Sequence, residues 1–318
     1  MNFTPGIHHI TAMASDPKRN FDFYTKILGM RFIKKTVNYD DPTTYHFYFA
    51  DKTGTPGTVL TFFPHPGLPR GKAGRGQAVE IAFAVPKSSL AFWIDRFHQK
   101  GIDYQGPEDR FGDRLIRITD PDGLFIELVG VDDVPSDNVW ITDEIGADVA
   151  IRGFHGITLW VEDYTKTAAL LTKHLGFQEA GMENSRYRYT TGKSGFGQVV
   201  DLRHLPGWER GRNGAGTIHH VAWRVGDDDS EVAVRDALAA EGFNITPVID
   251  RNYFHSVYFR EPNGVIFELA TDAPGFAIDE SVDELGHNLM LPPRYEAQRA
   301  EIVKILPVLE DVTLEDAT

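Results

Sequence analysis

The sequence predicts an α+β protein made of four βαβββ modules, and two kinds of internal repetition carry this prediction. An apolar strand followed by a helix that ends at a glycine recurs four times, and the four glycines are separated by 72, 75 and 66 residues. A spacing of about seventy residues fits duplicated supersecondary units rather than a short solenoid repeat. In addition, the segment DPDGLFIELVG (120–130) recurs as EPNGVIFELAT (261–271), each a Pro-x-Gly turn followed by a strand.

The four helices are bounded by residues that commonly start and end helices. The predicted helices cover 17–30, 87–100, 164–175 and 230–241, and they end at Gly29, Gly101, Gly176 and Gly242. Glycine adopts the left-handed conformation of a helix C-cap without a steric penalty. Asp16 and Asp163 precede two of these helices and are predicted N-caps, and Pro17 suits the first helical position.

The modules group into two tandem halves. We assign 1–135 to modules one and two, 136–151 to an acidic connector, and 152–275 to modules three and four. Residues 276–318 follow the repeats. The stretch LPPRYEAQRAEIVKIL (291–306) in this extension predicts a helix that starts at proline and packs onto the body.

Composition excludes several classes of function. The net charge of −14, without a basic tract, argues against nucleic acid or an anionic membrane surface as a partner. The absence of cysteine excludes disulfides, thiolate metal sites and a cysteine nucleophile. No run approaches the ~18 apolar residues of a membrane span, and the N-terminus does not look like a secretory leader. We therefore expect a cytoplasmic protein, and exposed sheet edges are compatible with a homodimer.

Two histidine pairs and one glutamate suggest the chemistry. His8-His9 lies in GIHHITAMA (6–14) and His219-His220 in TIHHVAWRV (217–225), both with strand composition, and Glu268 lies in the strand-like VIFELAT. One histidine from each pair plus the carboxylate gives the two-His-one-carboxylate set of non-haem Fe(II) oxygenases. A lone histidine on an apolar strand is more often a core residue, but two doublets at matching module positions favour metal binding.

The module pattern resembles the vicinal oxygen chelate superfamily, which includes glyoxalase I, bleomycin-resistance proteins and extradiol dioxygenases. The resemblance covers 6–271 and implies curved mixed sheets around a metal site, with ligand positions on the first and last strands of each module. In modules one to four the first-strand positions hold His9, Glu80, Gly156 and His220, and the last-strand positions hold Thr61, Glu127, Asp201 and Glu268.

Different pairings of modules give different metal sites. Modules one and four together offer His9, His220 and Glu268, whereas the first-strand position of module three is a glycine without a side chain. Modules one and two offer His9, Glu80 and Glu127, which is closer to a glyoxalase set. We interpret Glu80 and Glu127 as remnants of a degenerate second site. His155, which aligns with His8, is interpreted as structural.

The hairpin before the glutamate predicts which residue faces it. A three-residue loop at 262–264, with Gly264 in a left-handed position, pairs Glu261 with Val265 and Tyr258 with Glu268. A two-residue loop would instead send Tyr258 to the opposite face of the sheet.

Together these residues resemble the hydroquinone ring-cleaving branch of the extradiol dioxygenases. In that branch the second histidine of each pair binds iron, which corresponds to His9 and His220, and the first histidines, His8 and His219, support the site. Its arginine and tyrosine fall seventeen and ten residues before the ligand glutamate, as Arg251 and Tyr258 do here. Adjacent residues on a regular strand point to opposite faces, so His8 and His219 lie behind the sheet unless a bulge turns them.

The resemblance predicts an Fe(II)-dependent extradiol-type dioxygenase that inserts O₂ next to a hydroxylated carbon of a small hydroquinone-like substrate, such as a quinol formed in quinone detoxification. Mn(II) is the alternative metal. Tyr258 would move the substrate proton and Arg251 would stabilise negative charge. Two alternatives stay open: a glyoxalase-like isomerase or lyase using Ni²⁺ or Zn²⁺ at His9, Glu80 and Glu127, and a non-enzymatic protein that sequesters an aromatic ligand.

Overall fold

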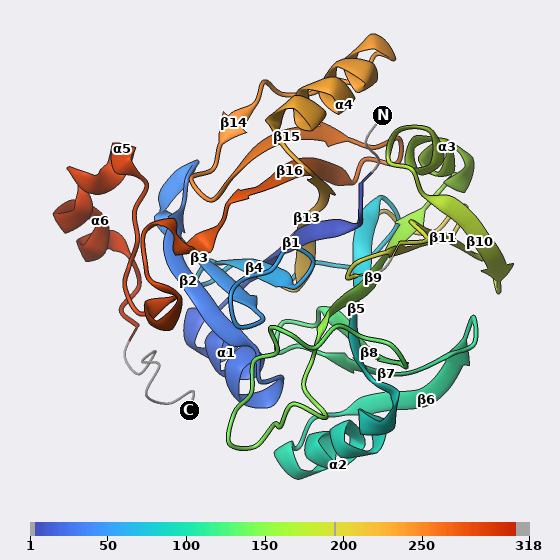
Figure 1. Cartoon of the computed structure of the whole chain (residues 1–318), viewed down its shortest axis with the longest axis horizontal. Helices are drawn as coiled ribbons and strands as arrows, with labels where there is room; N and C mark the ends of the chain where they lie inside the picture. The colour runs from blue at the N-terminus through green and yellow to red at the C-terminus, as the bar shows by residue number, and fades with distance from the viewer. Residues whose placement is uncertain (1–3, 194, 310–318) are drawn as a thin grey trace.

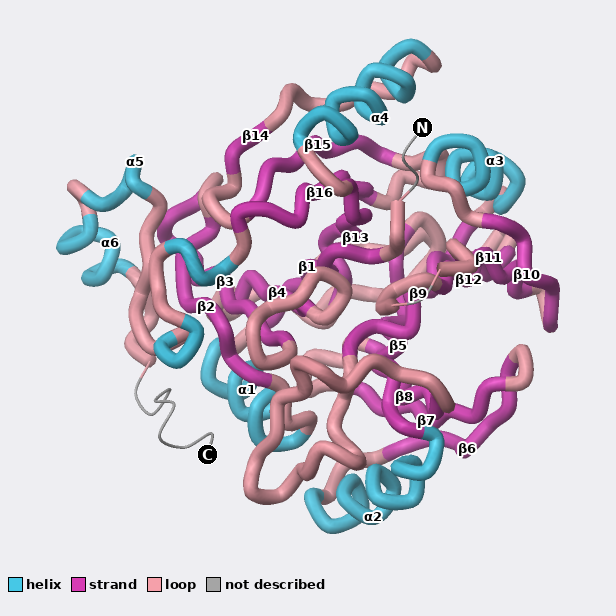
Figure 2. Tube along the Cα trace, in the orientation of Figure 1, coloured by secondary structure: helices cyan, strands magenta, loops and turns pink. Residues whose placement is uncertain are grey.

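The computed structural model describes residues 4–193 and 195–309, which form two eight-stranded mixed sheets with helices on their outer sides (Figures 1 and 2). The first sheet contains β1 (Ile7–Ala14), β2 (Arg31–Asn38), β3 (Asp41–Ala50), β4 (Val59–Pro64), β13 (Thr217–Val225), β14 (Ile249–Asp250), β15 (Phe254–Arg260) and β16 (Ile266–Pro274). The second contains β5 (Gln77–Pro86), β6 (Tyr104–Arg110), β7 (Asp113–Thr119), β8 (Phe125–Val131), β9 (Gly153–Val161), β10 (Gln178–Glu183), β11 (Arg186–Thr190) and β12 (Val199–His204). The helices are α1 (Pro17–Asp22), α2 (Leu90–Lys100), α3 (Tyr164–His174), α4 (Asp228–Ala240), α5 (Pro293–Glu296) and α6 (Arg299–Ile305).

Each sheet joins one module from each half of the sequence. The first sheet has the order β14-β15-β16-β13-β1-β4-β3-β2, so it combines modules four and one; the second has the order β10-β11-β12-β9-β5-β8-β7-β6 and combines modules three and two. The two modules of a sheet meet through antiparallel first strands, β1 with β13 and β5 with β9. The predicted α+β class and modular architecture are confirmed. The sequence boundaries at 135, 151 and 275 stay a prediction, and 1–3 and 310–318 lie outside the described residues.

The helix ends follow the local sequence signals. All four glycines have positive φ, with values of 66° for Gly29, 68° for Gly101, 75° for Gly176 and 88° for Gly242. The Asp16 carboxylate accepts a hydrogen bond from the Arg19 backbone N–H, and that of Asp163 accepts one from Thr165. The first predicted helix is less regular than expected, because α1 continues as a π-helix over Phe23–Ile27.

The C-terminal extension differs from the single helix predicted over 291–306. It forms two short helices, α5 and α6, interrupted between Glu296 and Arg299. Tyr295 Oη donates to the Tyr39 carbonyl and Arg299 Nη1 donates to the Leu289 carbonyl, so both turns are tied to backbone beside them. Because of these contacts, the extension follows the surface of the first sheet and does not form one straight helix.

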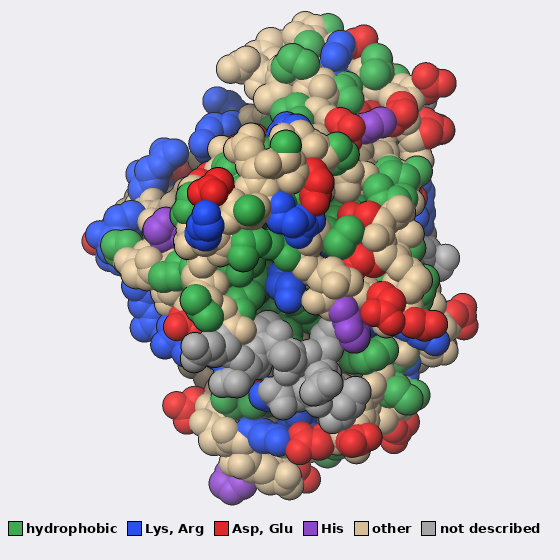
Figure 3. Space-filling model, turned by 90° about the vertical axis from the view of Figure 1, so that its left-hand side faces the viewer, with side chains coloured by type: hydrophobic (Ala, Val, Ile, Leu, Met, Phe, Trp, Pro, Cys, Tyr) green, Lys and Arg blue, Asp and Glu red, His purple; other side chains and the backbone are tan. Residues whose placement is uncertain are grey.

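The same extension contacts the first sheet through a buried charge. Lys34 of β2 is fully buried, and its Nζ lies 2.7 Å from Asp279 Oδ1 and 2.6 Å from Glu280 Oε2. A buried ammonium needs such partners, because desolvation without them is costly. Figure 3 looks onto the side that carries α5 and α6, where charged side chains of both signs surround hydrophobic ones. Within the described part of the chain, no helix has the length and apolar character needed to cross a membrane.

The two faces of the first sheet have different partners. Trp223 of β13 is fully buried, and its ring lies 5.1 Å from that of Phe267 on β16 within the main hydrophobic core. Ala222, the next residue, belongs instead to a separate cluster with Phe254 and Tyr48. The alternation of side chains along β13 thus divides its residues between the core and the opposite face of the sheet.

Candidate metal centre

Three buried ligand-type side chains converge in the middle of the first sheet. His9 Nε2 lies 3.2 Å and His220 Nε2 lies 2.9 Å from Glu268 Oε2, and the two Nε2 atoms are 3.4 Å apart. These are the residues that the sequence predicted as ligands. Among the described residues, this is the only group of three or more acidic or histidine side chains close enough to share a metal ion.

The pairing of modules one and four explains this convergence. On the antiparallel strands β1 and β13, His9 lies opposite Ala222 and His220 lies opposite Thr11. On the parallel strands β13 and β16, Ala222 lies beside Glu268. The three ligand-type residues therefore occupy neighbouring positions on three adjacent strands.

The donor atoms fit a divalent cation. Glu268 is fully buried, yet its Oε2 accepts no hydrogen bond of good geometry. Burial alone would raise the pKa of Glu268, but His9 and His220 outweigh this effect and hold the pKa well below its usual range. A buried carboxylate oxygen without a donor between two imidazoles is an expensive arrangement unless a cation satisfies it. Two imidazole nitrogens and one carboxylate oxygen are ligands that Fe(II) and Mn(II) accept.

β-Bulges turn the first histidine of each pair toward the second. The register between β1 and β13 is irregular between Ile7 and His9, and again at His219. His8 Nδ1 lies 2.9 Å from His9 Nδ1, and His219 Nδ1 lies 2.8 Å from His220 Nδ1. Of the two arrangements left open by the sequence, the structure shows the bulge, which re-aims side chains that a regular strand would separate.

These paired Nδ1 atoms constrain the tautomers. For His9 and His220 to direct an Nε2 lone pair at a metal, each must carry its proton on Nδ1 and donate it to the neighbouring histidine. His8 and His219 must then accept as neutral imidazoles. Burial, followed by the adjacent histidine, lowers the pKa of His8 well below its usual range and that of His219 to about 4. Both rings are therefore neutral at pH 7.

Tyr258 and Arg251 extend the polar network beyond the glutamate. Tyr258 lies opposite Glu268, and the Glu261 N–H donates to the Val265 carbonyl, which is the register predicted for a three-residue loop. Tyr258 Oη donates to Glu268 Oε1 at 2.9 Å, and Arg251 Nε donates to Tyr258 Oη at 3.2 Å. Burial and the nearby carboxylate raise the pKa of Tyr258 well above its usual value, so the phenol keeps its proton.

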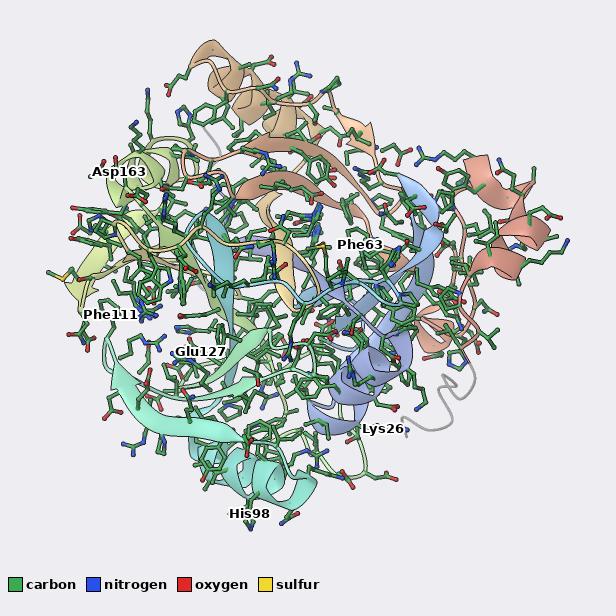
Figure 4. The ribbon with its side chains drawn as sticks, turned by 180° about the vertical axis from the view of Figure 1, so that it is seen from behind. Lys26, Phe63, His98, Phe111, Glu127 and Asp163 are labelled. Carbon is green, nitrogen blue, oxygen red and sulfur yellow. The ribbon has the colours of Figure 1, made fainter. Side chains whose placement is uncertain are left out.

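A cavity of about 520 Å³ opens onto these residues. Its walls combine aromatic, aliphatic and polar side chains, namely Met13, Tyr39, Thr44, His46, Tyr48, Phe63, Leu68, Phe254 and Ile266, together with His9, His219, His220, Arg251 and Tyr258. The size and mixed lining suit a small aromatic molecule. Figure 4 labels Phe63 of β4, whose ring lies 5.7 Å from that of His219 on β13.

His46 is a pocket residue that the sequence analysis missed. Its Nε2 lies 2.8 Å from Thr61 Oγ1, and its Nδ1 lies 2.9 Å from Tyr48 Oη. Thr61 Oγ1 in turn lies 2.7 Å from Thr11 Oγ1. The last-strand ligand position of module one, Thr61, is therefore a neutral hydroxyl engaged in hydrogen bonds. Burial lowers the pKa of His46 well below its usual value. The signal that could have found it is the alternation of side chains along the strand, which places His46 and Tyr48 on one face of the sheet and Tyr45 and Phe47 on the other.

Comparison with known proteins identifies the family to which the chain belongs. Residues 6–128 and 153–269 match the family model described as the Glyoxalase/Bleomycin resistance protein/Dioxygenase superfamily. The chain belongs to this superfamily. It is 45% identical to the "Putative ring-cleaving dioxygenase MhqO" of Bacillus subtilis, over 94% of this chain and 95% of the relative. It is 31% identical to the chlorohydroquinone/hydroquinone 1,2-dioxygenase of Sphingobium indicum, over 95% of both chains.

Solved structures agree with this membership. The crystal structure of a "putative dioxygenase" from Bacillus subtilis superimposes with a TM-score of 0.94 at 43% identity, covering 99% of this chain and 100% of the other. Glyoxalase I from Zea mays superimposes with a TM-score of 0.65 at 17% identity, over 89% of this chain and 97% of the other, which shows a shared fold. The superfamily fold is therefore common to proteins that are named for different activities.

In the second sheet, the acidic residues at the corresponding ligand positions are bound by arginines. Glu127 receives both guanidinium nitrogens of Arg110 at 2.9 Å, and Glu80 receives Arg186 Nη2 at 2.8 Å. Asp201, the remaining acidic position, is bound by Arg188 at 2.8 Å. The cavity there is only about 10 Å³. The interpretation of a degenerate second site agrees with these ion pairs (Figure 4 labels Glu127).

The glyoxalase-like set of His9, Glu80 and Glu127 is not assembled. His9 lies on β1 of the first sheet, whereas Glu80 and Glu127 lie on β5 and β8 of the second. The set required modules one and two to share a site, but they belong to different sheets. His155, interpreted as structural, is partly buried, with its Nε2 3.6 Å from Asp113.

Proposed function

We propose that this protein is an Fe(II)-dependent ring-cleaving dioxygenase that acts on hydroquinone-like aromatic compounds. The observation that carries the proposal is the convergence of His9, His220 and Glu268 on one point beside a cavity of about 520 Å³. Three protein ligands leave about three coordination positions for substrate and O₂. The names of the relatives from Bacillus subtilis and Sphingobium indicum, a ring-cleaving and a hydroquinone dioxygenase, support the same class of reaction, ring cleavage by O₂.

The two imidazoles and the carboxylate would hold the iron. When bound there, Fe(II) supplies activation of O₂ and electron transfer from an electron-rich ring. Mn(II) accepts the same donor set and is the alternative metal. His8 and His219 fix the orientation of the two ligand rings through their Nδ1 contacts. Such outer partners set both the tautomer and the basicity of a ligating histidine.

Aromatic and aliphatic walls would position the substrate ring. Phe63 and Tyr48 flank His46, with ring centroids 4.4 Å and 4.2 Å from its own, and Phe254 lies 5.0 Å from His9. These surfaces bury a flat apolar ring while leaving its hydroxyl groups near the polar side of the cavity. Orienting the ring in this way removes much of the entropic cost of reaching the reactive arrangement.

Tyr258 and Arg251 are placed to handle proton and charge. Tyr258 Oη lies beside Glu268, where it can exchange a proton with a substrate hydroxyl that enters the site. Burial opposes the charge on Arg251, but Tyr258 and Asp40 outweigh it and raise the pKa of the guanidinium. A permanent positive charge at this position stabilises negative charge that develops on a substrate oxygen.

The experiment is O₂ uptake by protein loaded anaerobically with Fe(II) and then given hydroquinone or methylhydroquinone. We expect one O₂ consumed per ring opened, with a matching change in the ultraviolet spectrum of the ring. His9→Ala and Glu268→Ala should lose iron and turnover together. Absence of uptake by iron-loaded protein across a panel of hydroquinones and catechols would refute the proposal.

A further inference from the structure

A second cavity, of about 320 Å³, lies against the proposed active site. His219 and Ile266 line both cavities, so the two cavities border each other at these residues. The ring of His219 lies 5.1 Å from that of His220, and Ile266 is the cross-strand partner of Arg260. The second cavity therefore lies beside His219, the neighbour of a proposed metal ligand.

Three arginines give this cavity a positive charge. Arg210, Arg212 and Arg260 all line it and are exposed to solvent. Within 4–193 and 195–309, none of them forms an ion pair with a carboxylate, although the chain carries 46 acidic residues against 32 basic ones. Three guanidinium groups that share a cavity without a carboxylate partner make a site for an anion.

Arg210 lies close to the turn that precedes the proposed metal ligand Glu268. A Cβ atom added at Gly264 would lie 3.0 Å from Arg210 Nη2, and one added at Gly76 would lie 3.9 Å from the same group. Both glycines have positive φ, 101° and 80°, and Gly264 belongs to the turn that leads into Glu268. The guanidinium group thus lies directly over the backbone of that hairpin, where a side chain at either glycine would crowd it.

The loop that carries Arg210 and Arg212 is held by a neighbouring loop, whereas Arg260 ends strand β15. The backbones of Lys72 and Arg212 exchange hydrogen bonds of 2.8 Å and 2.9 Å, and the Arg75 N–H donates to the Glu209 carbonyl at 3.0 Å. These bonds join the connection between β4 and β5 to the connection between β12 and β13. Arg210 and Arg212 therefore project from a loop held by backbone hydrogen bonds to its neighbour, which lowers the entropic cost of binding a ligand.

We propose that this arginine-lined cavity binds a carboxylate at the edge of the active site. The inference rests on the proposed ring cleavage. When the bond between a hydroxylated ring carbon and its hydrogen-bearing neighbour breaks, both atoms of O₂ enter the product, and no external reductant is required. The hydroxylated carbon becomes a carboxyl group and its neighbour an aldehyde. A neutral substrate thus gains a carboxylate, and the arginines bind that group or a carboxylate already on the substrate.

The test measures binding of cis,cis-muconate, an unsaturated six-carbon dicarboxylate, to the iron-loaded protein under anaerobic conditions by calorimetry. The double variant Arg210→Gln/Arg212→Gln should raise the dissociation constant about tenfold, because it removes two charge-assisted contacts. The single variant Arg210→Lys, which keeps the charge, should bind muconate more tightly than the double variant does. Arg114→Gln, which removes one positive charge at an exposed position on β7 of the second sheet, is the control for a loss of charge elsewhere and should leave the dissociation constant unchanged.

Two further measurements separate the sources of the carboxylate. A product subsite predicts that the double variant weakens inhibition by the ring-opened product, whereas a substrate subsite predicts a higher KM for 2,5-dihydroxybenzoate but not for hydroquinone. Either result supports the carboxylate site. Equal muconate affinity in wild type, double variant and control, with iron content and circular dichroism unchanged, overturns it. Muconate binding needs no turnover, so a failure of the dioxygenase proposal would appear separately as absent O₂ uptake.

Discussion

Replacing Tyr258 with phenylalanine isolates the role of one hydroxyl group beside the proposed metal centre. In the wild type this hydroxyl donates to Glu268 Oε1 at 2.9 Å and accepts from Arg251 Nε at 3.2 Å. The variant keeps the ring but leaves a fully buried carboxylate oxygen without its donor, which costs about 1–3 kcal/mol of folding stability. Losing a positioned proton donor lowers rates by about 10²-fold to 10⁴-fold.

We therefore expect Tyr258→Phe to retain iron, unfold at a lower denaturant concentration and lose at least about 100-fold in kcat. The assay is O₂ uptake at saturating hydroquinone, with iron per chain determined on the same sample. Tyr45→Phe is the matched control, because that buried hydroxyl donates to the Pro307 carbonyl and the side chain does not line the cavity. A kcat within about threefold of wild type, with full iron content, would show that this hydroxyl does not transfer the proton.

Three further predictions concern other parts of the molecule. His8→Phe should weaken Fe(II) affinity about 10-fold to 100-fold, because His9 loses its Nδ1 partner; unchanged affinity in a chelator competition would contradict this role. Arg110→Met should destabilise the protein by about 1–3 kcal/mol in urea unfolding, since it leaves the buried Glu127 Oε2 without its donor although Arg117 still binds Oε1, while the iron content stays the same. Burial without a hydrogen-bond partner raises the pKa of Glu231 to about 7, so folding favours its protonated form. That contribution to stability is complete below pH 4.5 and is lost as the pH rises through about 7. Glu231→Gln should remove at most about 3 kcal/mol of this pH dependence. If the free energy of unfolding changes equally between pH 5 and pH 8 in the wild type and in the variant, the assignment is contradicted.

The sequence predicted the features that depend on local patterns. The glycines that end the four helices adopt positive φ because the chain must turn there, whatever the tertiary context. The register of the β15–β16 hairpin follows from its loop, which is why Tyr258 faces Glu268 as expected. The likeness of the first and last strands in each module also located the three side chains that converge.

Features that depend on tertiary packing were not predictable in this way. The bulges that turn His8 and His219 arise where β1 meets β13, and neither strand records the irregularity in its own sequence. His46 reaches the cavity only because β3 lies beside β4 and Thr61. Arg186, which binds Glu80 in the second sheet, comes from β11 and lies 106 residues from that carboxylate in the sequence.

The measurement that tests the central claim most directly is a single turnover of the Fe(II)-loaded protein with hydroquinone under ¹⁸O₂, followed by mass spectrometry of the product. If His9, His220 and Glu268 hold iron for ring cleavage, the carboxyl group of the ring-opened product should carry ¹⁸O, because that group, unlike the aldehyde, does not exchange its oxygen with water at neutral pH, and Glu268→Ala should form no such product. Unchanged hydroquinone, or a product without ¹⁸O from protein that retains its iron, would contradict the account.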